Sequence, residues 1–157
     1  AIYTGLLEKI EPTDDELAQV MGHEISHALA NHTAEKMSMQ IATSVGVAVV
    51  GIASDNTGVA LTGAALTAML AVNLPNSRSA EKEADRIGIE LAAKAGYDPA
   101  AAATLWQKMG AESKSSTPQF LSTHPAPEDR QQKLTKLAVK MGPFYDPGAE
   151  HPVYQMR

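Results

Sequence analysis

The chain has 157 residues, of which 44% are hydrophobic, a net charge of −5 at pH 7 and no cysteine. That length is typical of a single domain with its own core, so we expect residues 1–157 to form one domain. The acidic balance, without any basic cluster, argues against nucleic acid as a partner. Because cysteine is absent, a disulfide framework is excluded, and any metal must be held by histidine and carboxylate ligands.

The first predicted elements are a short strand and a long helix. Residues 1–7, AIYTGLL, have a strand-like pattern. Thr13 then forms a capping box with Glu16, in which each side chain accepts the backbone N–H of the other residue. Apolar residues follow at helical spacing with no breaker, which predicts one helix from Thr13 to about Met39.

The most apolar region runs from Ile41 to Leu74, with a polar interruption at residues 54–58. The interruption leaves two segments too short to cross a bilayer, so we expect two helical arms around a turn. Burial in the core is the default expectation for these arms. Cover over a functional site and peripheral contact of residues 41–74 with a membrane surface are the alternatives.

A loop is predicted at residues 73–77, NLPNS, because proline and asparagine cluster there. A serine cap then opens a helix that we expect to run to Ala95. Gly96 supplies its C-terminal stop.

The last third of the chain predicts two more helices. Asp98 and Pro99 provide a cap and a first-turn proline for a helix that ends near Ala111. Residues 113–118 form a polar linker, and residues 127–141 form the final helix. Together with the composition, these elements predict a mainly α, compact domain with at most a short N-terminal strand or hairpin.

A metal-binding pattern lies in the stretch GHEISHA, residues 22–28. His23 and His27 are one helical turn apart, so both imidazoles project from one face and can share an ion. Glu24 lies about 100° around the axis from His23, which suits a base that takes a proton from water. His32 lies off that face, and we expect it to be a surface or packing histidine.

The alternative interpretation of this stretch is a solvated helix with ordinary polar residues. Gly22 argues against it, because a glycine costs about 1 kcal/mol inside a helix relative to alanine. Its place beside His23 indicates room for another backbone or for a substrate.

A hydrolytic zinc site needs a third protein ligand and one open position. The best candidate is the segment SAEKEAD, in which Glu81 and Asp85 share a helix face and Glu83 points elsewhere. This spacing allows Glu81 to bind the ion while Asp85 accepts the second ring N–H of a ligand histidine.

Two further residues downstream are candidates. His124 precedes a proline, which favours an extended backbone from which the ring could reach a cleft. It is a surface or structural residue, an oxyanion donor, or a group that occupies the open metal position. Arg130 either anchors this loop through a salt bridge or is a solvated helix charge. His151 has no supporting partners, and we treat it as part of the tail.

Four segments resemble one family, the gluzincin metallopeptidases of the HtpX, Oma and CAAX-prenyl-protease type, and within it the soluble periplasmic members. They are IYTGLL, HEISHALANH, SRSAEKEADRIG and LSTHPAPEDR, and together they span nearly the whole chain. The resemblance implies a zincin-like domain with one zinc ion per chain. It implies that His23, His27 and Glu81 bind the zinc, that Glu24 is the base and that Asp85 supports a ligand.

The resemblance also implies a function, a zinc endopeptidase that acts on unfolded or envelope polypeptides in the bacterial periplasm or at the membrane-associated cell envelope. It favours a functional His124 over a structural one. The family has a substrate-binding edge strand before YTGLL, most of which we expect to be missing here. Two alternatives are a zinc-stabilised domain that binds proteins without cutting them and a metal-free helical interaction module.

Overall fold

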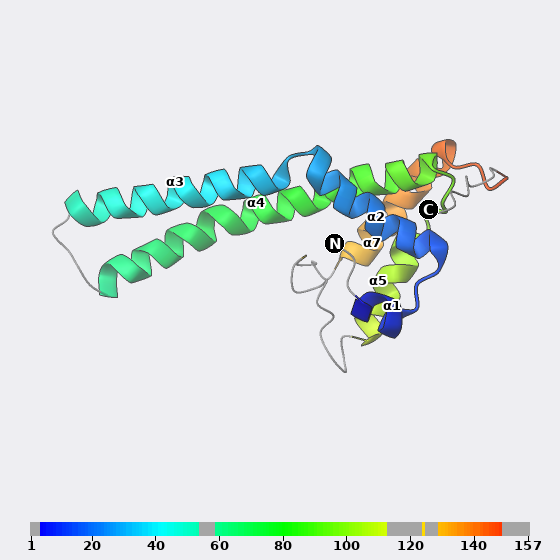
Figure 1. Ribbon diagram of the computed structural model, residues 1–157, viewed down its shortest axis with the longest axis horizontal. Helices are drawn as coiled ribbons and strands as arrows, with labels where there is room; N and C mark the ends of the chain where they lie inside the picture. The colour runs from blue at the N-terminus through cyan, green and yellow to red at the C-terminus, as the bar shows by residue number, and fades with distance from the viewer. Residues whose placement is uncertain (1–3, 54–58, 113–123, 125–128, 149–157) are drawn as a thin grey trace, which may run out of the picture. The chain divides into compact units, whose positions relative to one another are not determined.

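The computed structural model describes residues 4–53, 59–112, 124 and 129–148. Figure 1 shows the helices that these residues form. No strand occurs within these ranges, so the predicted mainly α class is confirmed. The strand-like pattern of residues 4–7 is a wrong prediction, because this segment is the first helix. In chain order the elements are α1 Thr4–Ile10, α2 Asp14–Leu29, α3 His32–Ala53, α4 Val59–Lys94, α5 Ala101–Glu112, α7 Arg130–Met141 and the short 3-10 helix η1 Gly142–Phe144.

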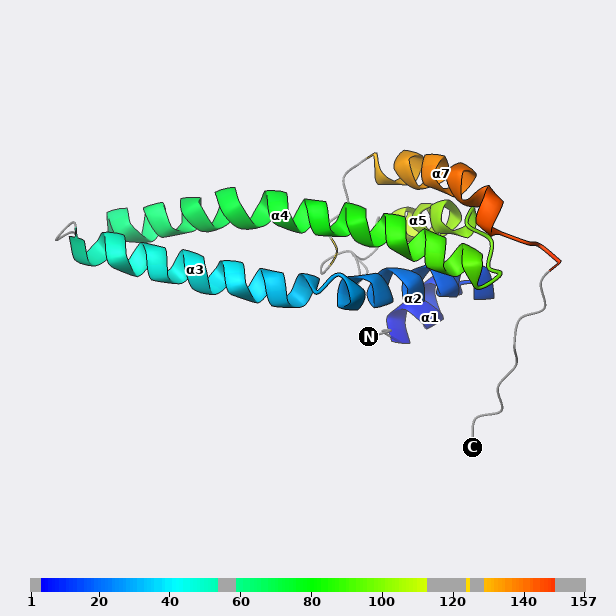
Figure 2. The ribbon, with the colours of Figure 1, turned by 90° about the horizontal axis from the view of Figure 1, so that it is seen from above.

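The chain divides into two compact units, one made of residues 1–26 and 83–157 and the other of residues 27–82. In the first unit, α5 packs against both α1 and α7, and Figure 2 shows α7 running beside α5. Two apolar clusters form the core of this unit. One contains Leu6, Ile10, Val20, Leu105 and Met109, and the other contains Ile89, Ala93, Ala102, Leu134 and Met141.

The start of α2 follows the predicted capping box. The Glu16 N–H donates to the Thr13 hydroxyl at 3.2 Å, and the Thr13 N–H donates to the Glu16 carboxylate at 2.9 Å. These two bonds satisfy backbone donors that the first turn of a helix leaves open. The predicted start of the helix is therefore confirmed.

The predicted continuation of this helix to Met39 is wrong. The helix ends at Leu29, and a new one begins at His32 after Asn31, whose φ of 56° is left-handed. Asparagine tolerates this conformation better than most residues because its short polar side chain can bond locally. Asn31 therefore ends α2, and its carbonyl accepts the Glu35 N–H at 3.0 Å in the next helix.

In the second unit, α3 and the first part of α4 run side by side in opposite directions, as both ribbon views show (Figures 1 and 2). The prediction of two helical arms is confirmed, while the turn at residues 54–58 lies outside the described residues. The predicted loop at 73–77 is wrong, because α4 is continuous through Pro75. A proline inside a helix removes one backbone hydrogen bond, but the good helix formers further out, such as Met69 to Ala71 before it and Ala80 to Ala84 after it, can carry the helix across it. Within the described segments, no helix is both long and apolar enough to cross a membrane.

The end of α4 and the start of α5 follow the sequence closely. Gly96 has a φ of 90°, and the Tyr97 N–H donates to the Ala92 carbonyl at 2.9 Å, which is a Schellman stop. The Asp98 side chain then accepts the Ala100 N–H at 2.8 Å, just before α5 begins. The last helix, α7, starts at Arg130 in the described residues, and the predicted linker at 113–118 lies outside them.

Candidate metal centre

Two glycines bring the backbones of α2 and α4 into direct contact in the first unit. A Cβ atom on Gly22 would lie 2.5 Å from the Gly88 carbonyl oxygen, and one on Gly88 would lie 2.7 Å from the His23 backbone nitrogen. Both distances are too short for any side chain. The predicted role of Gly22, which is to make room for another backbone beside His23, is therefore confirmed.

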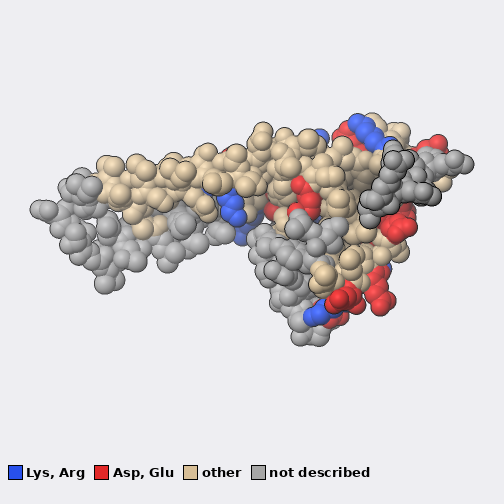
Figure 3. All heavy atoms as spheres, in the orientation of Figure 1, with Lys and Arg blue, Asp and Glu red and all other residues tan. Residues whose placement is uncertain are grey.

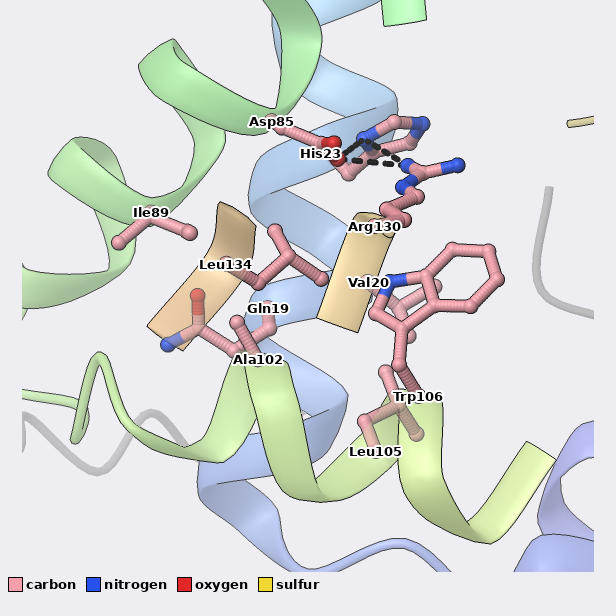
Figure 4. Close-up of a pocket in the computed structure, with 10 residues that line it drawn as sticks. All are labelled: Gln19, Val20, His23, Asp85, Ile89, Ala102, Leu105, Trp106, Arg130 and Leu134. Atoms are coloured by element: carbon pink, nitrogen blue, oxygen red, sulfur yellow. Dashed lines mark hydrogen bonds and ion pairs between the residues drawn. The ribbon is translucent and has the colours of Figure 1, made fainter. Parts of the chain in front are cut away.

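This close approach places His23 of α2 beside Asp85 of α4. The His23 Nδ1 lies 3.1 Å from the Asp85 Oδ1, and the same oxygen accepts a hydrogen bond from the Arg130 Nη2 at 2.6 Å. Arg130 is only 3% exposed, so the interpretation of a solvated helix charge is wrong. Its ion pair runs to Asp85 on α4. Figure 4 shows these three side chains meeting above a small apolar cavity lined by Val20, Ile89 and Leu134.

His124 contacts both His23 and Glu24 with its two ring nitrogens. The His124 Nδ1 lies 3.2 Å from the His23 Nε2, and the His124 Nε2 lies 3.1 Å from the Glu24 Oε1. The His23 and His124 rings meet edge to face, with their centroids 5.0 Å apart. His124 therefore contacts both Glu24 and the first histidine of the motif, which a surface histidine would not do.

The tautomers that these contacts favour leave two nitrogen lone pairs facing each other. If the His23 Nδ1 donates to Asp85, its Nε2 carries a lone pair; if the His124 Nε2 donates to Glu24, its Nδ1 does too. Two acceptors 3.2 Å apart repel unless a metal ion or an added proton lies between them. The donor chemistry of this pair therefore fits a bound metal ion.

In the second unit, His27 of α2 and Glu81 of α4 form a similar pair. The His27 Nε2 lies 3.3 Å from the Glu81 Oε1, and the Glu81 side chain is 8% exposed. The other ring nitrogen of His27 lies 2.9 Å from the Nδ1 of His32, which is buried. His32 is thus a packing histidine that orients His27. Its helical spacing from His27 did not predict this contact.

These histidine and glutamate side chains are a donor set that could hold a metal ion. The site also has an acidic group that is still accessible, because the Glu24 side chain is 26% exposed. A buried histidine, a carboxylate that contacts its second nitrogen and a partly exposed glutamate next to it are the kinds of group that a metal-assisted hydrolysis site needs.

The sequence pattern of peptidase family M48 matches residues 1–138, which include every residue of this candidate metal centre. The chain belongs to peptidase family M48. The family predicted from the four sequence segments is therefore confirmed.

Curated relatives with protease names agree with this assignment. The chain is 37% identical to the mitochondrial metalloendopeptidase OMA1 of Bos taurus, over 87% of this chain and 28% of the relative. It is 36% identical to the mitochondrial metalloendopeptidase OMA1 of Arabidopsis thaliana, over 88% of this chain and 27% of the relative. It is 34% identical to the beta-barrel assembly-enhancing protease of Yersinia pestis, over 83% and 29% respectively. The chain thus spans less than a third of each of these relatives. No solved structure matches it.

Proposed function

We propose that this chain is the catalytic domain of a zinc-dependent endopeptidase, in which His23, His27 and Glu81 hold one zinc ion. The observation that carries the proposal is the spacing of two donor pairs, 3.2 Å from His23 Nε2 to His124 Nδ1 and 3.3 Å from His27 Nε2 to Glu81 Oε1. Two ligands of a tetrahedral zinc ion with bonds of about 2.0–2.1 Å lie about 3.3–3.4 Å apart. Each pair therefore has the separation of two ligands on one ion.

The two helices that carry these donors support a shared ion. His23 and His27 are one turn apart on the single helix α2, and Glu81 is one turn before Asp85 on the single helix α4. Residues one turn apart on a helix project from the same face. Asp85 holds the His23 Nδ1 and so leaves the Nε2 as the ligand atom, which is the usual role of a carboxylate behind a metal-binding histidine.

Glu24 is the general base of the proposed reaction. Zinc, when bound, lowers the pKa of a coordinated water to about 7 and polarises the carbonyl group of the peptide. Glu24 accepts a proton from the attacking water as the new carbon–oxygen bond forms. It then passes that proton to the amine nitrogen as the carbon–nitrogen bond breaks, so that the carboxylate is regenerated.

His124 is proposed to keep the site latent. The other expectation is an oxyanion donor, but such a donor must point at the substrate carbonyl with its N–H free. Here the His124 Nε2 bonds to the base Glu24, and its Nδ1 faces the ligand His23 at the ligand separation. If a zinc ion were held by the three proposed ligands, this ring would be a fourth donor to it, and the same ring engages Glu24; both contacts would keep water and substrate out.

Unfolded or envelope polypeptides are the proposed substrates, at the bacterial periplasm or the membrane-associated cell envelope. The support comes from the relatives, among which those of Yersinia pestis and Escherichia coli are named beta-barrel assembly-enhancing proteases. The geometry of the donor set supports zinc as the cofactor. The names of the relatives support a polypeptide as the partner.

The test is chelator-sensitive cleavage of an unfolded, fluorescently labelled polypeptide, with Glu24→Gln as the decisive variant. Glu24→Gln should reduce kcat at least about 100-fold and leave the zinc content unchanged, because glutamine cannot accept the proton. The matched control is Glu8→Gln, at an exposed glutamate of α1, which should cleave at the wild-type rate. A Glu24→Gln variant as active as the wild type would remove the proposed base.

A second candidate function is a zinc-stabilised domain that binds polypeptides without cutting them. The observation that favours it is the His124 contact, because four protein ligands and no open position are typical of a structural zinc site. Only the endopeptidase function needs Glu24 as a base, so the two functions differ in whether the polypeptide is cleaved. If neither wild type nor His124→Ala cleaves the polypeptide while both bind zinc and the polypeptide, the binding function is correct.

We also propose that α3 contacts a lipid surface. Its apolar side chains Met37, Ile41, Val45 and Val49 recur at a spacing of four and are 57–63% exposed, so the default of core burial fails for them. Figure 3 shows uncharged side chains along most of this arm. From residue 37 to residue 77 the only charged residue is Asp55.

The chemistry of this stripe fits hydrocarbon better than a second copy of the chain or a soluble protein. The first charges outside the run are Lys36 and Arg78, one at the end of each arm away from the turn. Long cationic side chains can reach lipid headgroups while apolar neighbours lie among the acyl chains. The proposed contact is peripheral, with α3 lying along the surface.

A further inference from the structure

Arg130 is a buried cation whose two main contacts come from different helices. It is 3% exposed, its Nη2 donates to the Asp85 Oδ1 of α4 at 2.6 Å, and its guanidinium carbon lies 4.1 Å from the centre of the Trp106 ring of α5. A guanidinium plane stacks well on an indole face, and the attraction grows when the pair is removed from water. Figure 4 shows the Trp106 ring next to Arg130 on the side of the cavity opposite Ile89.

Trp106 is itself firmly held. It is half-buried and packs against both apolar clusters of the first unit, which meet at this side chain. A ring that touches two clusters has little freedom to reorient, whereas an arginine has several rotatable bonds and needs a fixed surface to keep one position. The Trp106 ring is therefore the immobile surface that holds the Arg130 guanidinium in one position.

The position of Arg130 reaches His23 mainly through the Asp85 Oδ1, and the Arg130 Nη2 also lies 3.5 Å from the His23 Nδ1. The Asp85 Oδ1 accepts from Arg130 at 2.6 Å and lies 3.1 Å from the His23 Nδ1. A displaced guanidinium would pull that oxygen with it or release it, and the His23 ring would lose the bond that sets its tautomer. The chain of contacts thus runs from Trp106 through Arg130 and Asp85 to the proposed ligand histidine.

We propose that Trp106 is a positioning residue of the metal site, which acts through Arg130 and Asp85 to hold the His23 Nε2 as a ligand atom. The proposal rests on the zinc site proposed above. It differs from a purely structural role, because core packing alone would make a Trp106 variant less stable without weakening zinc binding by the folded protein. Partners behind a ligand typically change metal affinity by about 10-fold to 100-fold when they are lost.

The experiment measures zinc affinity by competition with a chromophoric chelator, at a temperature where each variant is folded. Trp106→Leu removes the aromatic face and should weaken zinc binding about tenfold, while Trp106→Phe keeps a face and should stay within about threefold of wild type. Arg130→Lys, which keeps the charge but loses the stacked plane, should weaken binding as Trp106→Leu does. The matched control is Thr104→Ala, at a residue of the same helix that belongs to neither apolar cluster; it loses the hydrogen bond to Glu16 and should lower the melting temperature but leave the affinity unchanged.

A second readout needs no metal. Nitrogen NMR of the histidine side chains reports which ring nitrogen carries the proton, and His23 in the metal-free wild type should be protonated at Nδ1 only. Trp106→Leu should show a mixture of tautomers, and Trp106→Phe should not. The proposal is overturned if Trp106→Leu keeps both the wild-type affinity and the single tautomer, or if Thr104→Ala loses affinity to the same extent. If the wild type itself binds no zinc, the zinc site is wrong, while the tautomer measurement still decides the role of Trp106.

Discussion

Lys108 of α5 donates to the buried Glu16 of α2 across a distance of 2.6 Å, which ties the N-terminal capping box to the core of the first unit. Glu16 is only 2% exposed, and its second oxygen accepts the Thr104 hydroxyl at 2.8 Å. Burial raises the pKa of Glu16, but the bonds from Lys108, Thr13 and Thr104 together lower that pKa below its usual value of 4.5. The charged form is thus the one that the fold stabilises.

This pair predicts how stability depends on pH. A carboxyl whose pKa is lower in the folded than in the unfolded chain contributes stability above the unfolded pKa and loses it as pH falls through the folded pKa. The unfolding free energy of the wild type should therefore fall as pH drops below about 4.5. Glu16→Gln should lower stability at pH 7 and flatten this acid limb, as urea titrations at a series of pH values would show.

Lys108→Met is the control for that measurement, since it removes the cation and leaves the carboxyl in place. It should flatten the acid limb as well, because Glu16 then loses its strongest stabilising partner. An acid limb of unchanged slope in both variants would show that Glu16 does not contribute to it.

The contact of Gly22 with Gly88 predicts that neither position accepts a side chain. Gly88→Ala places a methyl group within 2.7–2.9 Å of three backbone atoms of α2, so the two helices must move apart. We expect the free energy of unfolding to fall by about 1–3 kcal/mol or more, as for other overpacked sites. The same displacement moves Asp85 away from His23, so zinc affinity should fall as well.

Gly110→Ala is the matched control for the glycine pair. A Cβ atom at Gly110 meets nothing within 4 Å, so alanine should leave stability unchanged or raise it by up to about 1 kcal/mol. Chemical unfolding curves of the three proteins give the comparison. Equal stability of Gly88→Ala and Gly110→Ala would mean that the α2–α4 approach is looser than the structure has it.

The parts of the fold that the sequence predicted are those with a local signal. The capping box at Thr13, the helix stop at Gly96 and the close approach at Gly22 each depend on a residue type with a distinct backbone property or side-chain bond. The break at Asn31 had a weak signal of the same kind, because asparagine tolerates positive φ, but the apolar spacing on either side outweighed it. Pro75 led to the opposite error, because the sequence predicted a loop where the helix continues. A proline does not always end a helix when the segments before and after it favour helix.

The parts that the sequence did not predict depend on contacts between distant segments. Glu81 and Asp85 were proposed from their spacing, but nothing in the spacing identified Trp106 as the surface behind Arg130. His32 was placed correctly off the ligand face, yet its buried contact with His27 depends on the turn at Asn31. Periodicity assigns a face to a residue, and only tertiary packing assigns its partner.

The exposed stripe on α3 predicts binding to lipid vesicles. Ile41→Lys puts a charge into the middle of the apolar face and should reduce the vesicle-bound fraction about tenfold in a co-sedimentation assay. Val139→Lys, at an apolar side chain of α7 that is 77% exposed, is the matched control and should bind like the wild type. No binding by the wild type would exclude the lipid contact, and a change of sedimentation coefficient on Ile41→Lys would identify a second copy as the occupant.

The contacts of His124 predict that removal of its ring raises the activity of the enzyme and weakens its zinc binding. His124→Ala frees the Glu24 carboxylate and the position facing the His23 Nε2, so kcat/KM for an unfolded polypeptide should rise about tenfold. Because one donor is lost, zinc affinity should fall severalfold in the chelator competition. The control is His151→Ala, at the other histidine that precedes a proline, which should change neither value. Lower activity of His124→Ala at saturating zinc would instead make the ring part of the catalytic machinery, since an oxyanion donor contributes only while it is present.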